Sequence, residues 1–249
     1  MPLVSRSVLC VVQALLVFAG GGRVVAQAED TPRVLVFTAT NGWRHASIPA
    51  GIAAVRELGA AHGFGVDATE DSTRFHPDTL ARYDAVVFLN TSGDVLDEAG
   101  QAALQAFVEG GGGFVGVHAA SDTEYEWPWY GELVGAYFAD HPEQQTATVV
   151  VEDAEHPSTA RLPARWERFD EWYNFRSAPA GVRVLARLDE STYEGGTMGA
   201  DHPIAWSHTV GEGRAWYTAL GHTAESYAEP LFRQHLLGGL LWALGRADG

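Results

Sequence analysis

Short, uninterrupted runs of apolar residues recur along this 249-residue chain. Such runs are typical of strands buried on both faces of a parallel sheet. The strands expected on this basis span residues 33–38, 66–69, 83–89, 114–117 and 215–220. Helices are expected over residues 49–62, 97–109 and 230–244. This alternation of strands and helices predicts an α/β fold on a doubly wound, mostly parallel sheet.

The second half of the chain is less regular. Residues 145–152 alternate between apolar and polar side chains, as a half-buried strand does, and residues 182–188 form another expected strand. Residues 203–208 and 214–220 are expected to pair as a hairpin, and residues 131–138 to be helical. The second half therefore adds a β-rich excursion to the parallel core.

The first 28 residues have the pattern of a secretory signal peptide. Arg6 supplies positive charge, residues 8–19 are mostly apolar, and Ala26-Gln27-Ala28 is a small-x-small cleavage site. The apolar run is too short to span a bilayer comfortably, although retention as an N-terminal anchor is the alternative. We expect residues 29–249 to form one mature domain, secreted or periplasmic, that does not insert into a membrane.

The composition disfavours several classes of protein. Cys10 is the only cysteine and lies inside the predicted signal peptide. The mature chain would then have no disulfide, no thiolate metal ligand and no cysteine nucleophile. The formal net charge of −16 disfavours nucleic acid and anionic membranes as partners. We expect no nucleotide cofactor, and the oligomeric state stays open.

The first candidate for chemistry is His118. It follows the glycine-rich turn 110–113 and the expected strand 114–117, at the point where that strand should end. Ligands of open α/β sheets bind outside the carboxyl ends of the strands. The alternative is a buried histidine that bonds a backbone carbonyl.

Two further histidines share this kind of position. His45 and His222, like His118, each follow an expected strand closely, so all three are predicted to face one pocket. Three imidazoles, or two with a carboxylate, can hold Zn²⁺ or another divalent ion. A histidine paired with a carboxylate can instead transfer protons without a metal. The candidate carboxylates are Asp122, Glu124, Asp170 and Glu171, and a structural ion pair with a neighbouring arginine is the alternative for the last two.

Several polar and aromatic residues are candidates for binding a sugar, whose apolar ring face can stack on an aromatic side chain. For the aromatic residues and His202 the alternative is a structural role, in the core or, for His202, in a His-Pro turn. The predicted substrate-binding residues are Trp43, Arg44, Asp122, Tyr173, His202 and Trp206.

Five motifs, in the same order, resemble those of the ThuA-like (trehalose-utilisation) family. They occupy residues 42–45, 113–122, 170–173, 202–206 and 221–223, within a resemblance that covers residues 33–244. The resemblance implies a flavodoxin-like three-layer sandwich related to the class I glutamine amidotransferases.

In that superfamily a cysteine stands on a sharp turn after a strand, and a histidine follows a later strand. The resemblance places His118 at about the cysteine's position and His222 at about the histidine's. Residues 221–225 depart from the superfamily's His-x-Glu pattern. We therefore expect no glutamine amidotransferase activity.

The resemblance also links the chain to sugar catabolism, and to cleavage or isomerisation of an oxidised (3-keto) glycoside or disaccharide. A histidine would remove the acidic proton at C2, with His118 and His222 central. A metal ion or Arg44 would hold the enolate oxygen, and Glu171 or Asp170 would protonate the leaving group. The alternatives are a noncatalytic carbohydrate-binding module and an ordinary glycosidase with two acid groups.

Overall fold

The computed structural model describes residues 31–247, and its centre is a nine-stranded sheet. The predicted signal peptide lies outside these residues. Five strands are parallel, in the order β2 (Gly65–Thr69), β1 (Arg33–Phe37), β3 (Ala85–Leu89), β4 (Gly113–Val117) and β11 (Gly213–Thr218). Four antiparallel strands continue the sheet, in the order β10 (Pro203–Val210), β9 (Arg183–Asp189), β6 (Gln145–Val151) and β7 (Arg165–Asp170).

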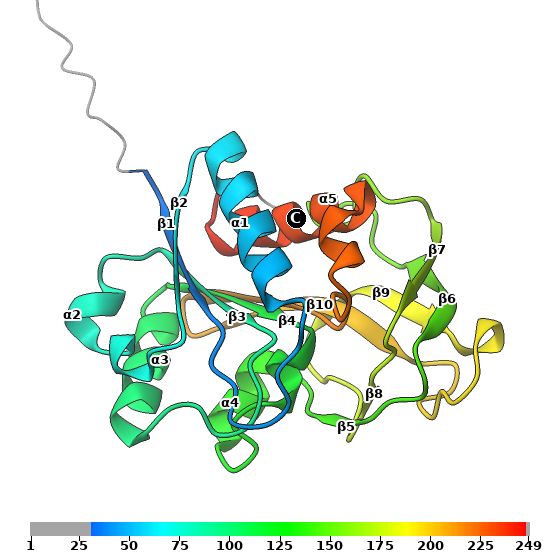
Figure 1. The fold of residues 1–249 in the computed structure, drawn as a ribbon, viewed down its shortest axis with the longest axis horizontal. Coiled ribbons are helices and arrows are strands. Elements are labelled where there is room, and N and C mark those ends of the chain that lie inside the picture. Colours follow the sequence, from blue (N-terminus) through cyan, green and yellow to red (C-terminus); the bar gives the residue numbers. More distant parts are fainter. Residues whose placement is uncertain (1–30, 248–249) are drawn as a thin grey trace, which may run out of the picture. The chain divides into compact units, whose positions relative to one another are not determined.

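The parallel half of the sheet is covered on both faces. Every residue of β3 and β4 is buried, as is all of β1 after Arg33, which explains their unbroken apolar runs. Helices α1 (Ile48–His62) and α5 (Pro230–Ala243) cover one face, and α3 (Glu98–Glu109) and α4 (Pro128–Val134) cover the other (Figure 1). The predicted α/β three-layer sandwich is confirmed.

The helix predicted over residues 131–138 has different bounds. Helix α4 starts at Pro128, whose fixed φ suits the first helical turn, and it ends before Gly135, which has a φ of +90°. Residues Phe138–Asp140 are instead strand β5, which pairs with β8 (Asn174–Phe175) in a separate two-stranded sheet. A short helix, α2 (Pro77–Leu80), was not predicted.

The antiparallel half brings a further strand end to the same edge of the sheet. Four successive antiparallel pairings separate β7 from β11, so β7 runs in the direction of the parallel strands and also ends at their carboxyl edge. The carboxylate of Asp170, the last residue of β7, accepts hydrogen bonds from the backbone N–H groups of Gly221 and His222. Three strands separate β7 from β11 in the sheet, so the end of β7 and the loop after β11 meet across the carboxyl edge of the sheet. No helix in the described part of the chain is both long and apolar enough to cross a membrane.

Candidate active site

A cavity of about 630 Å³ opens at the carboxyl edge of the parallel strands. Its lining comes from four segments, which are the loop after β1, the turn after β4, the segment after β7 and the loop after β11, together with Phe138, His141 and Gln144 from β5 and its connection to β6. These four segments carry His45, Asp122, Glu171 and His222 into the lining, and His118 lies beneath them, fully buried. The predicted convergence of the three histidines is therefore present in the structure.

His118 stands on a sharp turn directly after β4. Its φ of +50° lies in the left-handed region, which is uncommon for a residue with a side chain. Its ring donates a hydrogen bond from Nδ1 to the carbonyl oxygen of Ala219, at 2.7 Å. This bond places a proton on Nδ1 and turns Nε2 toward the cluster, where it can carry a second proton or, in a neutral ring, offer a lone pair to a metal ion.

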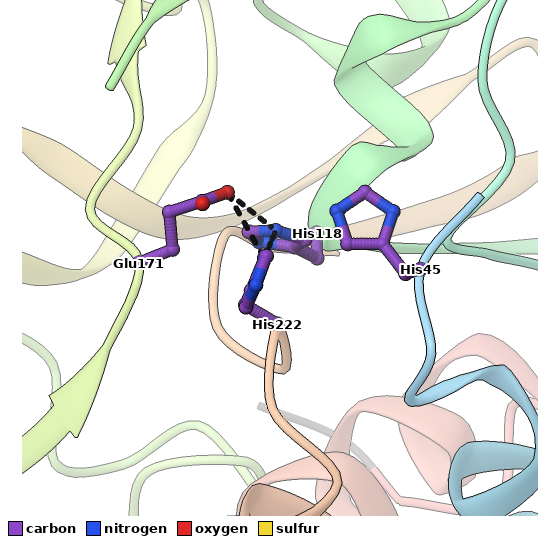
Figure 2. Close-up of side chains that lie close together, drawn as sticks. All are labelled: His45, His118, Glu171 and His222. Atoms are coloured by element: carbon purple, nitrogen blue, oxygen red, sulfur yellow. Dashed lines mark hydrogen bonds and ion pairs between the residues drawn. The ribbon is translucent and has the colours of Figure 1, made fainter. Parts of the chain in front are cut away.

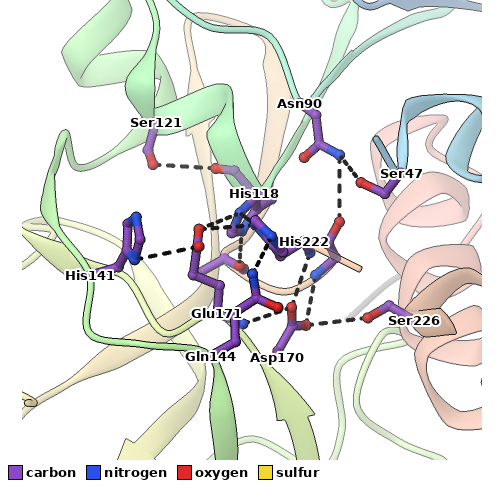
Figure 3. Close-up of polar contacts among 12 residues, drawn as sticks. Ser47, Asn90, His118, Ser121, His141, Gln144, Asp170, Glu171, His222 and Ser226 are labelled. Atoms are coloured by element: carbon purple, nitrogen blue, oxygen red, sulfur yellow. Dashed lines mark hydrogen bonds and ion pairs between the residues drawn. The ribbon is translucent and has the colours of Figure 1, made fainter. Parts of the chain in front are cut away.

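His222 is fixed through its backbone. Gly221 adopts a φ of +107°, and the next amide, that of His222, donates to Asp170 Oδ1 at 3.0 Å. Oδ2 of the same carboxylate accepts a hydrogen bond from Gly221 N–H at 2.9 Å and forms an ion pair with Arg168 at 3.0 Å. Figure 3 shows Asp170 beneath the loop that carries His222. Asp170 is fully buried and its side chain holds this loop, whereas Glu171, the next residue, turns its carboxylate to the histidines.

Four side chains converge closely: His45, His118, Glu171 and His222 (Figure 2). One ligand atom from each lies within 4.8 Å of the other three. Glu171 Oε2 is 3.3 Å from His118 Nε2 and 3.0 Å from His222 Nδ1. The ring of His45 lies 4.9 Å from that of His118 and 5.0 Å from that of His222, between centroids. We call these four residues the His₃Glu cluster.

The electrostatics of the cluster favour a neutral His45 and an ionised Glu171. Burial, reinforced by the nearby His118 and His222, lowers the pKa of His45 to about 3. Burial acts to raise the pKa of Glu171, but its hydrogen bonds to His118 and His222 outweigh this and hold the pKa well below its usual range. Neutral imidazole and carboxylate are the protonation states that bind metals.

The donor set of the His₃Glu cluster fits a divalent cation. His118 Nε2 lies 3.3 Å from a carboxylate oxygen of Glu171, and two atoms with lone pairs at this distance need either a proton or a metal ion between them. Three nitrogens and one carboxylate oxygen are ligands that suit Zn²⁺ and related ions. Of the predicted metal set, His45, His118 and His222 all belong to the cluster, and Glu171 joins them.

Two polar residues at the rim support the cluster. His141 Nδ1 lies 3.4 Å from Glu171 Oε1, and the amide nitrogen of Gln144 lies 2.8 Å from His222 Nε2 (Figure 3). Neither His141 nor Gln144 is among the site residues predicted from the sequence. A glutamine before an expected strand carries no local signal for a site.

Asn90 was also missed, although it joins two of the loops. It follows β3 with a φ of +52° and donates from its amide to Ser47 Oγ, at 3.1 Å. Ser47 stands at the N-cap position of α1, but its side chain makes no capping hydrogen bond. A polar residue after an apolar strand is the sequence signal that Asn90 shares with the histidines.

The structure separates the predicted substrate-binding residues into two groups. Trp43, Arg44, Asp122 and Tyr173 line the cavity. The Tyr173 ring packs on that of His118 at 4.1 Å between centroids, and Asp122 Oδ1 accepts a hydrogen bond from Tyr125 at 2.7 Å. Burial raises the pKa of the Asp122 carboxyl.

The second group does not line the cavity. His202 is fully buried, and its Nε2 donates to the Tyr173 carbonyl oxygen at 2.8 Å while Nδ1 faces Glu190. Trp206 is a core residue that donates to the Val134 carbonyl oxygen at 2.9 Å. Among the candidate carboxylates, Glu124 is likewise buried and accepts from the backbone of Val95 and Leu96. The structural alternative therefore holds for His202 and Trp206, and Glu124 also has a structural role.

The sequence of the described domain matches a known family. The family model ThuA, described as trehalose utilisation, matches residues 33–243. The chain belongs to the ThuA family. This family lies in the class I glutamine amidotransferase-like superfamily, as the motif resemblance predicts.

Solved structures with this fold include other ThuA-like proteins. One from Bacteroides uniformis is 26% identical, with a TM-score of 0.74 over 88% of this chain and 94% of its own. One from Parabacteroides merdae is 23% identical, with a TM-score of 0.73 over 88% and 92%. A cytoplasmic protein of Salmonella typhimurium shares the fold at 12% identity, with a TM-score of 0.60 over 84% and 98%. None of the curated proteins compared with the chain matches it.

Proposed function

We propose that this ThuA-family protein is a metal-dependent enzyme that cleaves or isomerises a 3-keto glycoside or disaccharide. The observation that carries the proposal is the His₃Glu cluster at the base of a cavity large enough for a sugar. His45, His118, His222 and Glu171 would hold a divalent ion. When bound, such an ion supplies Lewis-acid stabilisation of charge on a carbonyl oxygen.

If the histidines hold the ion, other side chains must move the protons. Asp122 lines the cavity, and its raised pKa brings it closer to the pH at which a general base works well. We assign Asp122 to removal of the C2 proton, which is acidic because C3 is a ketone. The electron pair of the C2–H bond forms an enolate between C2 and C3. The enolate then re-forms the C3 ketone, a double bond forms between C1 and C2, and the bond from C1 to the glycosidic oxygen breaks.

The departing oxygen needs a proton. His141 lines the same cavity on the side of Glu171, and we assign it to protonate this oxygen. The products are an unsaturated keto sugar and a free alcohol, and addition of water to the former would complete a hydrolysis. Asp170 was the other residue expected to donate this proton. Its carboxylate instead accepts hydrogen bonds from Gly221 and His222 and pairs with Arg168, so we assign it a positioning role.

Elemental analysis of the purified protein, with His118→Ala and His222→Ala alongside, tests the cluster. One divalent ion per chain, lost in both variants, together with turnover of 3-keto glycosides but not of the unoxidised sugars, is the expected result. Turnover of unoxidised glycosides would favour a glycosidase. Sugar binding without any turnover would favour a noncatalytic module.

A further inference from the structure

A second cavity, also about 630 Å³, adjoins the first. It lies beside β7 and the residues that precede α5, and three residues line both cavities: Gln144, Thr223 and Glu225. Gln144 is the residue whose amide contacts His222. A ligand that leaves the His₃Glu cluster in this direction therefore passes Gln144 before it enters the second cavity.

The lining of the second cavity has the chemistry of a sugar subsite. Phe169 is 52% exposed, and within residues 31–247 the only other large apolar side chain so exposed is Trp43, on the first cavity. An exposed aromatic ring offers a flat face to the C–H side of a pyranose. Carboxylates accept hydrogen bonds from hydroxyl groups. Three line this cavity with Phe169, and they are Glu167, Glu225 and Glu229.

Charge defines which glycosyl units fit. Arg168 is the one basic residue in the lining, and it is 6% exposed and paired with Asp170 and Glu229. The accessible charge of the second cavity is therefore negative. A phosphorylated or carboxylated sugar would be repelled, whereas an uncharged one would not.

We infer that the second cavity binds the neutral leaving-group sugar of a disaccharide whose oxidised ring lies at the His₃Glu cluster. The inference rests on the proposed function and extends it to the size and charge of the substrate. The glycosidic bond would lie near Gln144, between the two cavities. The aromatic side chain at each end would stack on one ring, Trp43 on the oxidised sugar and Phe169 on the leaving group.

Calorimetric titration tests the subsite without turnover. The probes are trehalose, methyl α-glucoside and trehalose 6-phosphate, each added to the metal-loaded protein. We expect trehalose to bind more tightly than the other two. Phe169→Ala should weaken trehalose about tenfold and leave methyl α-glucoside unchanged, Phe169→Trp should restore binding, and Trp43→Ala should weaken both sugars.

Three results would overturn the subsite. They are equal affinity for trehalose and methyl α-glucoside, an unchanged affinity of Phe169→Ala for trehalose, and no binding of any probe. Tight binding of the phosphorylated sugar would overturn its assignment to neutral sugars. The proposed function is judged separately, by turnover of methyl α-3-ketoglucoside, a substrate that does not reach the second cavity. If the protein turns over this compound but Phe169→Ala does not change the affinity for trehalose, the proposed enzymatic function is supported and only the subsite is contradicted.

Discussion

The carboxylate of Asp170 accepts hydrogen bonds from the backbone N–H groups of both Gly221 and His222, at 2.9 and 3.0 Å. One buried side chain at the end of β7 thus fixes the loop that carries a histidine of the His₃Glu cluster. Its ion pair with the buried Arg168 balances its charge.

Asp170→Asn should therefore weaken both the fold and the site. An asparagine has one acceptor oxygen, so one of the two N–H groups would face an NH₂ group, and Arg168 would lose a charged partner. We expect the free energy of unfolding to fall by about 3 kcal/mol and metal affinity to fall about 10- to 100-fold. Urea unfolding and zinc titration measure these quantities.

The matched control is Asp67→Asn, which removes the carboxylate of the half-exposed Arg33–Asp67 pair. Its effect on unfolding should stay below about 1 kcal/mol, with zinc affinity unchanged. An Asp170→Asn protein that binds zinc like the wild type would contradict the positioning role.

Asp122→Asn should separate proton transfer from metal binding. We expect kcat on a 3-keto glycoside to fall about 10²- to 10⁴-fold, with the metal content unchanged because Asp122 lies outside the His₃Glu cluster. Loss of the metal together with activity would instead show that Asp122 supports the cluster.

Tyr125→Phe should shift the pH profile. The Tyr125 hydroxyl stabilises ionised Asp122 and so acts to lower its pKa. Because a base must be ionised, activity rises with pH through this pKa. Loss of the hydroxyl raises the pKa, so the rise should move to higher pH in kcat/KM profiles. A profile that does not move would argue against Asp122 as the base.

Metal removal should lower thermal stability, because an ion that binds only the folded chain stabilises it by mass action. We expect chelation to reduce the midpoint of thermal unfolding and added zinc to restore it. His118→Ala should lose this response, whereas His76→Ala, at an exposed helix start, should keep it. An equal response in both variants would place the ion elsewhere.

The pH dependence of stability should report a histidine remote from the cluster. His235 is buried in α5, donates from Nδ1 to the Ser158 carbonyl oxygen and contacts Thr218 through Nε2. Burial lowers its pKa from 6.5 to about 3. The unfolded chain therefore binds one more proton than the folded chain between these values.

Stability should accordingly be complete above about pH 6.5 and fall as the pH decreases, by up to about 1.4 kcal/mol per pH unit from this residue. Urea unfolding of the metal-free protein between pH 4 and 7 measures the slope. In His235→Asn the slope should be smaller, at a cost in absolute stability. If the slope of the unfolding free energy against pH is unchanged in His235→Asn, other groups cause the pH dependence.

The parallel half of the fold was predictable because its strands are buried on both faces. Continuous apolar runs such as β3 identify such strands, and a histidine just after a strand end is then close to the functional edge. His45, His118 and His222 were found in this way.

The antiparallel half hides its contribution. Glu171 follows β7, and nothing in the alternating pattern of β7 shows that four reversals of direction return its end to the same edge. The adjacent residues Asp170 and Glu171 also look alike in sequence, yet one holds a loop and the other faces the histidines. His202 precedes a strand instead of following one, and it is buried in the core.

The contact between the end of β7 and the loop after β11 has a consequence for folding. The His₃Glu cluster draws on residues 45, 118, 171 and 222, so none of the local segments contains a binding site by itself. The four atoms meet only after the last antiparallel strand has docked. An ion held there would act as a non-covalent cross-link between the two halves of the sheet. Its affinity would then depend on how fully the antiparallel half has packed against the parallel half.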